Sequence, residues 1–481
     1  MSRGRADRPA ARPGEGGGDG SAGTGAGRGV FFGVPDGRGD AGGVRGVSVN
    51  VAEWILRLKY EDLPEAVRRQ IRRCLLDGVG AAVAGSRTRT GQIAAAFAEE
   101  MGRDGPATVL ASGRRLALAP AVLANVVAAN AYDIDDGYRQ VKGHPGGFVI
   151  MPALAACEAC GAGDLLCAVA AGYEVATRAG VATHRHYAHY HASGSWGALG
   201  AAACIGRIAG LDAERMGWAL GLAEYHAALS PMERCLAHPA MTKDGIGWGA
   251  CAVGLAEKGF TGIPCLLDEP ENGDLITDLG MRWRVLDLYF KPYACCRWAQ
   301  PAVDAVLGLQ RRHGLTHGDA KRIVVHTFRE AADLQKTPPR TPEEAQYHLS
   351  WPIAAALVQG EVGPRQVGEE ALTDRVMQRV AGVVEAVVEA EIQARFPAEA
   401  LAWVEVETMD GRWFRSDLIP ARGDAHTPLS DEEVEAKFRW LTGPVIGGDA
   451  AERIIEAVAR VEEKDGGERL VEAVREAVKK A

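Results

Sequence analysis

The 481-residue sequence has no excess of basic residues, because its 54 lysines and arginines are outnumbered by 63 aspartates and glutamates. The formal net charge of -9 therefore gives no basic surface of the kind that binds nucleic acid or an anionic membrane. The sequence also has no uninterrupted apolar stretch of the roughly 18 residues that a membrane span needs. We expect neither nucleic acid nor a membrane as a partner, and a small molecule fits better.

The ten cysteines do not show the spacing of a disulfide framework, and are scattered through apolar segments such as those around Cys167, Cys204 and Cys251. Cysteines in such surroundings are typical of reduced, buried thiols in a cytoplasmic protein. Residues 1–46 have too few large apolar side chains to offset the entropy of ordering, and no apolar stretch that would mark a secretory signal. We expect a disordered tail, a cytoplasmic location and no disulfides.

The hydrophobic pattern is helical almost throughout residues 47–287, where strand signals are scarce. Glycine and alanine cluster within the expected helices, and such small side chains let neighbouring helices approach closely. The segment therefore predicts one all-helical domain. The helices are expected at Val51–Leu58, Glu65–Ala82, Gly91–Met101, Leu116–Tyr132, Val149–Cys160, Leu165–Val181, Ser195–Ile208, Met216–Ala228 and Gly247–Lys258.

The pattern changes in residues 288–426. Arg322–Phe328 and Ala402–Glu407 are β-branched and alternating, and Met409–Arg412 is typical of a hairpin turn. Leu372–Ala394 is expected to hold helical segments between these strands. Together the features predict a smaller α+β domain.

Residues 427–481 return to amphipathic helix, with an N-cap at Ser430 and acidic residues in the first turn. Because their apolar stripes need a partner, we expect them to pack on the first helical domain. The predicted fold class is mainly α with an α+β insertion: a large all-helical domain built from both ends of the chain, and a smaller α+β lid domain. A cleft between two such domains is a usual place for a substrate site.

Three carboxylates and an imidazole stand close together after the run Leu116–Tyr132, at Asp133, Asp135, Asp136 and His144. A carboxylate at the C-terminal end of a buried helix faces the negative end of the helix dipole, and burial acts in the same direction. Both effects disfavour the charged form and predict a pKa for Asp133 in the range useful for acid/base catalysis. A solvated turn is the plain alternative for Asp135 and Asp136, whereas Asp133 and His144 are the predicted acid/base pair.

Four histidines follow within eight residues, and the last of them, His191, lies just before a helix rich in glycine and alanine. An imidazole beside the free backbone amides of a helix start is suited to binding a carboxylate. A metal site is the alternative for the group, although its loop spacing matches no firm ligand signature. We predict a catalytic role for His191 and no metal, and we expect His184, His186 and His189 to be surface residues.

Two further segments bring cations. Lys243 stands in a glycine-rich entry to a helix, and Lys291 and Arg297 begin the α+β part together with the vicinal thiols Cys295 and Cys296. A lysine among glycines is suited to an anionic group, although a lysine beside a helix start is usually just solvated. For the thiols, a nucleophilic cysteine beside Arg297 is the alternative to packing.

An acid/base pair with several cations and imidazoles on separate segments suits a small polycarboxylate. Removing a proton next to a carboxylate builds up negative charge, which lysine, arginine and histidine can stabilise while Asp133 or His144 moves the proton. Elimination, decarboxylation and epimerisation can all pass through such an intermediate.

Several motifs together give the chain a specific resemblance to the MmgE/PrpD family. They are NAYDIDDG with GHPGG (130–147), GYEVATRAG (172–180), HASGSWGALGAAA (191–203), GLAEKGFTGI (254–263), KPYACCRWAQPAVDA (291–305), SWPIAAALVQGEVG (350–363) and KFRWL (437–441). The family includes 2-methylcitrate dehydratase, cis-aconitate decarboxylase and iminodisuccinate epimerase. The resemblance implies a homodimer, metal-independent chemistry with no cofactor, and the domain arrangement expected above.

The resemblance also places the active site at Asp133, His144, His191, Lys243 and Lys291. We predict that the first four are catalytic and that Lys291 binds the substrate together with Arg297, Asp136 and Cys296. The decarboxylase branch is expected to have a threonine where Gly137 stands, one residue fewer between the aspartate and the histidine, and a second imidazole where Cys296 stands. These departures count against decarboxylation of cis-aconitate, and they fit a separate bacterial branch with its own substrate as well as methylcitrate dehydration. We predict a hydro-lyase similar to 2-methylcitrate dehydratase. The alternatives are an epimerase of an iminodisuccinate-like dicarboxylate and a cis-aconitate-type decarboxylase.

Two other classes of protein stay open. An iron-sulfur dehydratase would need three cysteine ligands, which Cys157 and Cys160 with Cys74 or Cys204 could supply. The pair lies in an apolar helical pattern, however, which favours buried thiols. A helical binding or scaffold protein that kept the fold without its chemistry is the non-enzymatic alternative.

Overall fold

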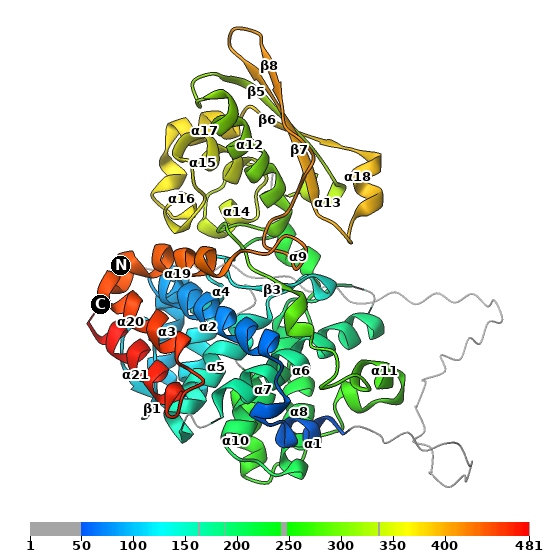
Figure 1. Ribbon diagram of the computed structural model, residues 1–481, viewed down its shortest axis with the longest axis vertical. Helices are drawn as coiled ribbons and strands as arrows, with labels where there is room; N and C mark the ends of the chain where they lie inside the picture. The colour runs from blue at the N-terminus through cyan, green and yellow to red at the C-terminus, as the bar shows by residue number, and fades with distance from the viewer. Residues whose placement is uncertain (1–49, 162–163, 188, 242–247, 335–336, 481) are drawn as a thin grey trace, which may run out of the picture. The chain divides into compact units, whose positions relative to one another are not determined.

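The computed structural model of the protein describes residues 50–161, 164–187, 189–241, 248–334 and 337–480. Helices make up most of this part of the chain, and small sheets complete it (Figure 1). The tail that the sequence predicts at residues 1–46 lies outside the described residues.

The helices expected in the N-terminal half are present, with ends that differ by a few residues. Their bounds are α1 Val51–Arg57, α2 Glu65–Gly85, α3 Arg89–Met101, α4 Leu118–Asn130, α5 Pro145–Cys160, α6 Leu165–His186, α7 Gly194–Ile208, α8 Ala213–Tyr225 and α10 Trp248–Glu257. The short helix α9 Met232–Ala237 was not predicted. Small residues set the packing as predicted: a Cβ on Gly200 of α7 would lie 2.8 Å from the carbonyl oxygen of Gly172 in α6. The two helix backbones therefore touch, which larger side chains would prevent.

One described helix, α6, is long and apolar enough to cross a membrane by length and composition. Of its most apolar window, 94% is buried inside the protein, as in the core helix of a globular domain. The helix continues to His186, so His184 and His186 are helical, and the expectation that they lie in a loop is wrong.

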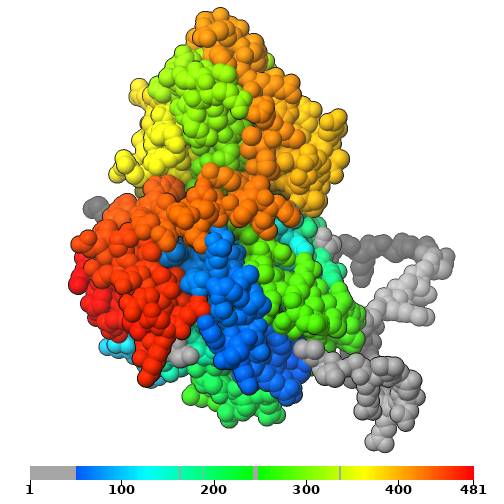
Figure 2. Space-filling model, in the orientation of Figure 1, coloured from blue at the N-terminus to red at the C-terminus, as the bar shows by residue number. Residues whose placement is uncertain are grey.

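Three helices follow near the end of the chain, α19 Asp431–Ile446, α20 Gly448–Ala459 and α21 Gly466–Lys479. Ser430 caps α19 as predicted, because its hydroxyl accepts from the amide of Glu433, whose carboxylate accepts from the amide of Ser430. α19 lies against α2 (Figure 2), and a Cβ on Gly80 would lie 3.1 Å from the ring of Phe438. Buried side chains of both chain ends share one hydrophobic core.

A five-stranded sheet lies in the later part of the chain. β5 Ala320–Thr327 pairs in parallel with β6 Val384–Val388 and antiparallel with β7 Leu401–Thr408. β7 also pairs with β8 Trp413–Arg415 and β9 Ile419–Pro420. The sequence predicts β5, β7 and the turn before β8 correctly but places β6 in a helical stretch, because β6 is defined by a distant partner strand rather than by its own pattern.

A second hydrophobic core lies between this sheet and the helices beside it. The helices of this part are α12 Gln300–His313, α13 Arg329–Ala332, α14 Pro342–Gln346, α15 Ser350–Gln359, α16 Pro364–Val367, α17 Arg375–Ala381 and α18 Ala390–Arg395. α12 contacts both β7 and α15, so it joins the sheet to the helical layer.

Two short ladders complete the described strands. β1 Asp104–Thr108 pairs with β2 Arg115–Leu116, and β3 Gly137–Tyr138 pairs with β4 Leu288–Tyr289. In the second ladder Gly137 stands opposite Tyr289, and a Cβ on Gly137 would lie 2.2 Å from the tyrosine ring. Only glycine fits there, and the ladder brings the segment after α4 beside the segment that holds Lys291.

Candidate active site

A cavity of about 70 Å³ lies where the segment after α4 meets the segment after β4. Five of the predicted site residues line it, although they are far apart in the sequence: Asp133, His144, Lys291, Cys296 and Arg297. The wall also holds apolar side chains, among them Trp298 and Phe396. The sequence thus predicted residues that the fold brings to one place, while their roles stay predictions.

Asp133 and Lys291 form a buried ion pair. Nζ of Lys291 lies 2.6 Å from Oδ2 of Asp133 and 2.8 Å from the carbonyl oxygen of the same residue. Burial lowers the pKa of Lys291, but the charge and hydrogen bond of Asp133, together with Tyr289 and Cys296, outweigh it and raise the pKa above its usual value. In turn the ammonium favours the ionised form of the carboxylate. The helix-dipole effect expected for Asp133 is therefore opposed by a cation from a distant segment.

His144 precedes α5 and faces this ion pair. Its Nε2 lies 3.4 Å from Oδ1 of Asp133, and its Nδ1 lies 3.0 Å from the carbonyl oxygen of Asp136 and 3.3 Å from Oδ1 of Asp135. Burial and the charge of Lys291 lower the pKa of His144, but Asp135 and Asp133 outweigh them and raise it above 6.5. Because the neighbours of Nδ1 are acceptors, this nitrogen carries a proton and Nε2 faces the reacting side.

Asp135 and Asp136 are buried, with 0% and 1% of their surface exposed, so the solvated turn considered for them is wrong. Oδ2 of Asp136 accepts from the hydroxyl of Tyr173 at 2.5 Å, and Oδ1 accepts from the amide of Gly146 at 2.9 Å. Burial, and then the charge of Asp77, raises the pKa of Asp136 to about 7. Asp136 does not line the cavity, so the geometry makes it a support for the loop rather than the substrate contact expected from the sequence.

Five polar residues of the cavity wall were not predicted from the sequence: Arg139, Lys142, Tyr289, Tyr347 and Asp424. The hydroxyl of Tyr347 donates to Oδ1 of Asp133 at 3.1 Å. Arg297 forms a 2.5 Å ion pair with Asp424 and lies over the ring of Tyr289, 4.1 Å from its centroid. Tyr347 stands three residues before the motif at 350–363 and Tyr289 two residues before Lys291, and these positions are the only local signals for them.

His191 lies before α7, as expected, but it does not line the cavity. Its amide donates to Nε2 of His184 at 2.9 Å, and the two rings are parallel with centroids 6.1 Å apart. Burial lowers the pKa of His191. Since His184 is engaged in this way, the expectation that it is merely a surface residue is wrong. Lys243, the fourth predicted catalytic residue, lies outside the described residues.

Two cysteines of the iron-sulfur alternative, Cys157 and Cys160, lie on one helix. Cys157 is buried and Cys160 exposed, both near the end of α5. Burial raises the pKa of the Cys157 thiol to about 12. Within the described ranges, no three side chains of histidine, cysteine, aspartate or glutamate are grouped so that they could hold a metal ion.

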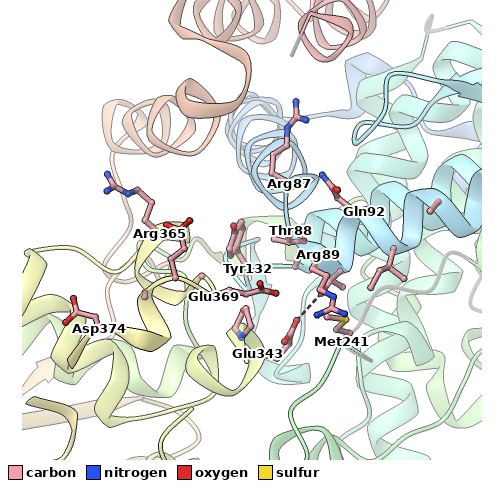
Figure 3. Close-up of a pocket in the computed structure, with 18 of the residues that line it drawn as sticks. Arg87, Thr88, Arg89, Gln92, Tyr132, Met241, Glu343, Arg365, Glu369 and Asp374 are labelled. Carbon is pink, nitrogen blue, oxygen red and sulfur yellow. Dashed lines mark hydrogen bonds between the residues drawn. The ribbon is translucent and has the colours of Figure 1, made fainter. Parts of the chain in front are cut away.

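A larger hollow of about 900 Å³ is lined by Tyr132, the neighbour of Asp133 (Figure 3). Charges of both signs surround it: Arg87, Arg89, Arg365, Glu343, Glu369 and Asp374. Oε1 of the buried Glu343 accepts from the hydroxyl of Thr90 at 3.0 Å, which links α3 to α14. Neither sign of charge predominates, and none of the predicted site residues that the structure describes lines this hollow. The smaller cavity is therefore the candidate active site.

Proteins of known name resemble the chain over most of its length. A cis-aconitate decarboxylase-like protein, oryM, from Aspergillus oryzae is 24% identical over 463 residues, which span 86% of this chain and 94% of that protein. The cis-aconitate decarboxylase of Homo sapiens is 23% identical over 453 residues, 87% of this chain and 92% of the relative. That of Aspergillus terreus is 24% identical over 304 residues, 57% and 62% respectively. These likenesses support a lyase.

Family models match both halves of the chain. The MmgE/PrpD N-terminal domain matches residues 49–276, which contain Asp133 and His144, and the MmgE/PrpD C-terminal domain matches residues 293–463, which contain Arg297 and Tyr347. The two family models therefore cover residues of the cavity wall from both halves of the chain. The resemblance predicted from the sequence motifs is confirmed, and the chain belongs to the MmgE/PrpD family.

Proposed function

We propose that the protein is a lyase that removes a proton next to a carboxylate of a small polycarboxylate, and that its reaction is a dehydration of the 2-methylcitrate type. One observation carries the proposal: Asp133, Lys291 and His144 meet in the wall of one cavity, at 2.6 to 3.5 Å from one another. A carboxylate paired with an ammonium and an imidazole with a raised pKa are suited to be base and acid at the same pH.

In the proposed reaction the carboxylate of Asp133 takes the proton from the carbon next to a substrate carboxylate. The electron pair of that C–H bond forms the C=C bond as the C–O bond of the neighbouring hydroxyl breaks. The imidazolium of His144 gives its proton to the leaving oxygen, so the products are an alkene and water. Lys291 stabilises the negative charge that develops on the substrate carboxylate, which is the most demanding part of such a step.

Tyr347 is positioned to assist Asp133. Its hydroxyl donates to Oδ1 while Lys291 contacts Oδ2, so both oxygens of the carboxylate are held in place before substrate arrives. Groups that are fixed in advance do not lose freedom during the reaction, which lowers its barrier. Tyr347 is therefore part of the proposed site, although its position in the sequence did not indicate a role.

Decarboxylation is the second candidate, and it is favoured by the names of the relatives in Aspergillus and Homo sapiens. In that reaction a C–C bond breaks, carbon dioxide leaves and the carbon takes a proton. Two features at and beside the cavity count against decarboxylation. Gly137 leaves room that the Tyr289 ring fills, and Cys296 lines the wall where the decarboxylase branch is expected to have an imidazole.

Incubation of the protein with 2-methylcitrate, citrate, cis-aconitate and iminodisuccinate in deuterated water, followed by NMR, separates the candidates. New alkene signals from 2-methylcitrate or citrate are the expected result. Formation of itaconate from cis-aconitate would show that the reaction is a decarboxylation and not a dehydration. Deuterium exchange without change of formula would show that the reaction is an epimerisation. No change with any compound would contradict the proposal of a polycarboxylate lyase.

A further inference from the structure

The loop of residues 138–143 folds back on itself at the edge of the cavity. The amide of Tyr138 donates to the carbonyl oxygen of Gly143 at 2.9 Å, so the loop is closed. Val141 is fully buried, and a Cβ on Gly143 would lie 2.6 Å from both Oγ of Ser193 and the ring of Trp196. These contacts hold the backbone of the loop in place. Its two charged side chains, Arg139 and Lys142, are left to line the cavity.

Lys142 has an uncommon backbone conformation, and its ammonium lies against two aromatic rings. Its backbone φ is 49°, in the left-handed region that residues other than glycine rarely adopt and that is found where the surrounding structure imposes it, often at functional sites. Nζ lies 3.7 Å from the ring centroid of Tyr190 and 5.2 Å from that of Phe396. Burial lowers the pKa of Lys142, while Glu330 and Glu233 act on it only from a distance.

The charges of the cavity wall do not balance. It holds two carboxylates, of which Asp133 pairs with Lys291 at 2.6 Å and Asp424 pairs with Arg297 at 2.5 Å. Arg139 and Lys142 are the remaining cations, and across the described part of the chain neither forms an ion pair. Arg139 donates only to a backbone carbonyl, that of Ala398. An anionic ligand would balance the charges of these two cations.

We propose that Lys142, with Arg139 beside it, binds a second carboxylate of the substrate, distinct from the one next to the proton that Asp133 removes. The inference rests on the proposed function and makes the substrate at least a dicarboxylate. The rings of Tyr190 and Phe396 exclude water on two sides of the ammonium, so its attraction for a carboxylate is stronger than that of a lysine on the open surface.

Calorimetric titration with unreactive carboxylates tests the proposal on the full chain. The probes are propane-1,2,3-tricarboxylate, glutarate and butyrate, which carry three, two and one carboxylates. Lys142→Met is expected to weaken binding of the first two by about tenfold, the change that one partly desolvated ion pair gives. Binding of butyrate is expected to stay the same, because a single carboxylate goes to Lys291.

Three further variants control the titration. Lys142→Asn also removes the charge and tolerates a left-handed backbone, so it separates the loss of charge from strain. Lys142→Arg keeps the charge and is expected to retain most of the affinity. Lys464→Met removes an exposed lysine outside the cavity and is expected to bind all three probes as the wild type does.

An equal loss for all three probes, or no loss for any, overturns the proposal, as does a wild type that binds none of them. The outcome is distinguishable from that of the proposed function. If Lys142 controls binding of glutarate but no polycarboxylate is turned over, the carboxylate subsite is supported and the proposed dehydration is contradicted. If 2-methylcitrate is dehydrated and Lys142→Met leaves its KM unchanged, the dehydration stands and the subsite falls.

Discussion

The ammonium of Lys437 in α19 donates a 2.7 Å hydrogen bond to the carbonyl oxygen of Ile134, the residue after Asp133. The same Nζ lies 2.5 Å from Oδ1 of Asp77 in α2, and both side chains are buried. Asp133 itself has a left-handed backbone with φ 52°, a conformation that needs support from its surroundings. A lysine from near the end of the chain therefore holds the backbone on which the proposed base stands.

Lys437→Met is expected to lower the free energy of unfolding by about 3–5 kcal/mol, because Asp77 is left as a buried, unpaired charge. Urea denaturation measures the loss. The double variant Lys437→Met with Asp77→Leu removes both charges and is expected to recover most of the stability. Its kcat is expected to stay low, since the carbonyl of Ile134 still lacks its donor. A double variant with wild-type kcat would show that Lys437 serves stability alone.

The rate is expected to fall as the pH rises through the raised pKa of His144, because the proposed acid is then deprotonated. Asp135 is one of the two carboxylates that raise this pKa. Asp135→Asn removes a negative charge beside the imidazolium, so the pKa falls and the alkaline limb of kcat against pH moves to lower pH. Asp104→Asn, on an exposed aspartate, is the matched control. An alkaline limb that stays in place in Asp135→Asn, or moves upward, contradicts His144 as the acid.

Asp136 gives a separate prediction about stability. Its pKa is about 7 in the folded protein against an ordinary value of 3.8, so the folded state binds the extra proton between these values. The stability that this proton contributes is present below 3.8 and is lost as the pH rises through about 7. Melting temperatures of Asp136→Asn and wild type are therefore expected to diverge with rising pH in this window, in favour of the variant. A constant difference would mean that Asp136 ionises normally.

The homodimer expected from the family resemblance stays a proposal, and α3 offers a surface for it. Ile93, Phe97 and Met101 lie one turn apart on this helix and are 51%, 50% and 55% exposed. A row of apolar side chains in water is typical of an interface. We expect light scattering to give twice the mass of one chain for the wild type and a single chain for Phe97→Glu. Met409→Glu, on another exposed side chain, is expected to stay dimeric, and a dimeric Phe97→Glu would exclude this face.

Local pattern was enough to predict most helices and two of the principal strands, because each of these segments carries its own apolar periodicity. It was not enough for β6, whose identity depends on pairing with β5. The motif around Asp133 and His144 could be picked out as a candidate site because its carboxylates and imidazole lie close together in the sequence. The burial of Asp136 could not, because its partner Tyr173 lies 37 residues away on α6.

Residues that reach the cavity by long-range pairing were the hardest to predict. Tyr289 arrives through the ladder of β3 and β4, and Tyr347 through the short helix α14. Lys142 was not singled out from the sequence, because its setting comes from the closed loop and from two rings, those of Tyr190 and Phe396, that are distant in the sequence. Lys437 was seen within a family motif but without a role, because neither Asp77 nor Ile134 is near it in the sequence.

The central claim is that the carboxylate of Asp133 removes the substrate proton, and Asp133→Asn tests it most directly. The measurement is deuterium incorporation and turnover by NMR, with the polycarboxylate on which the wild type acts, in variant protein whose circular dichroism matches that of the wild type. The account predicts that both rates fall by about 10²-fold or more, the range expected for loss of a general base, while the substrate still binds. Turnover and exchange at wild-type rates in Asp133→Asn would contradict it.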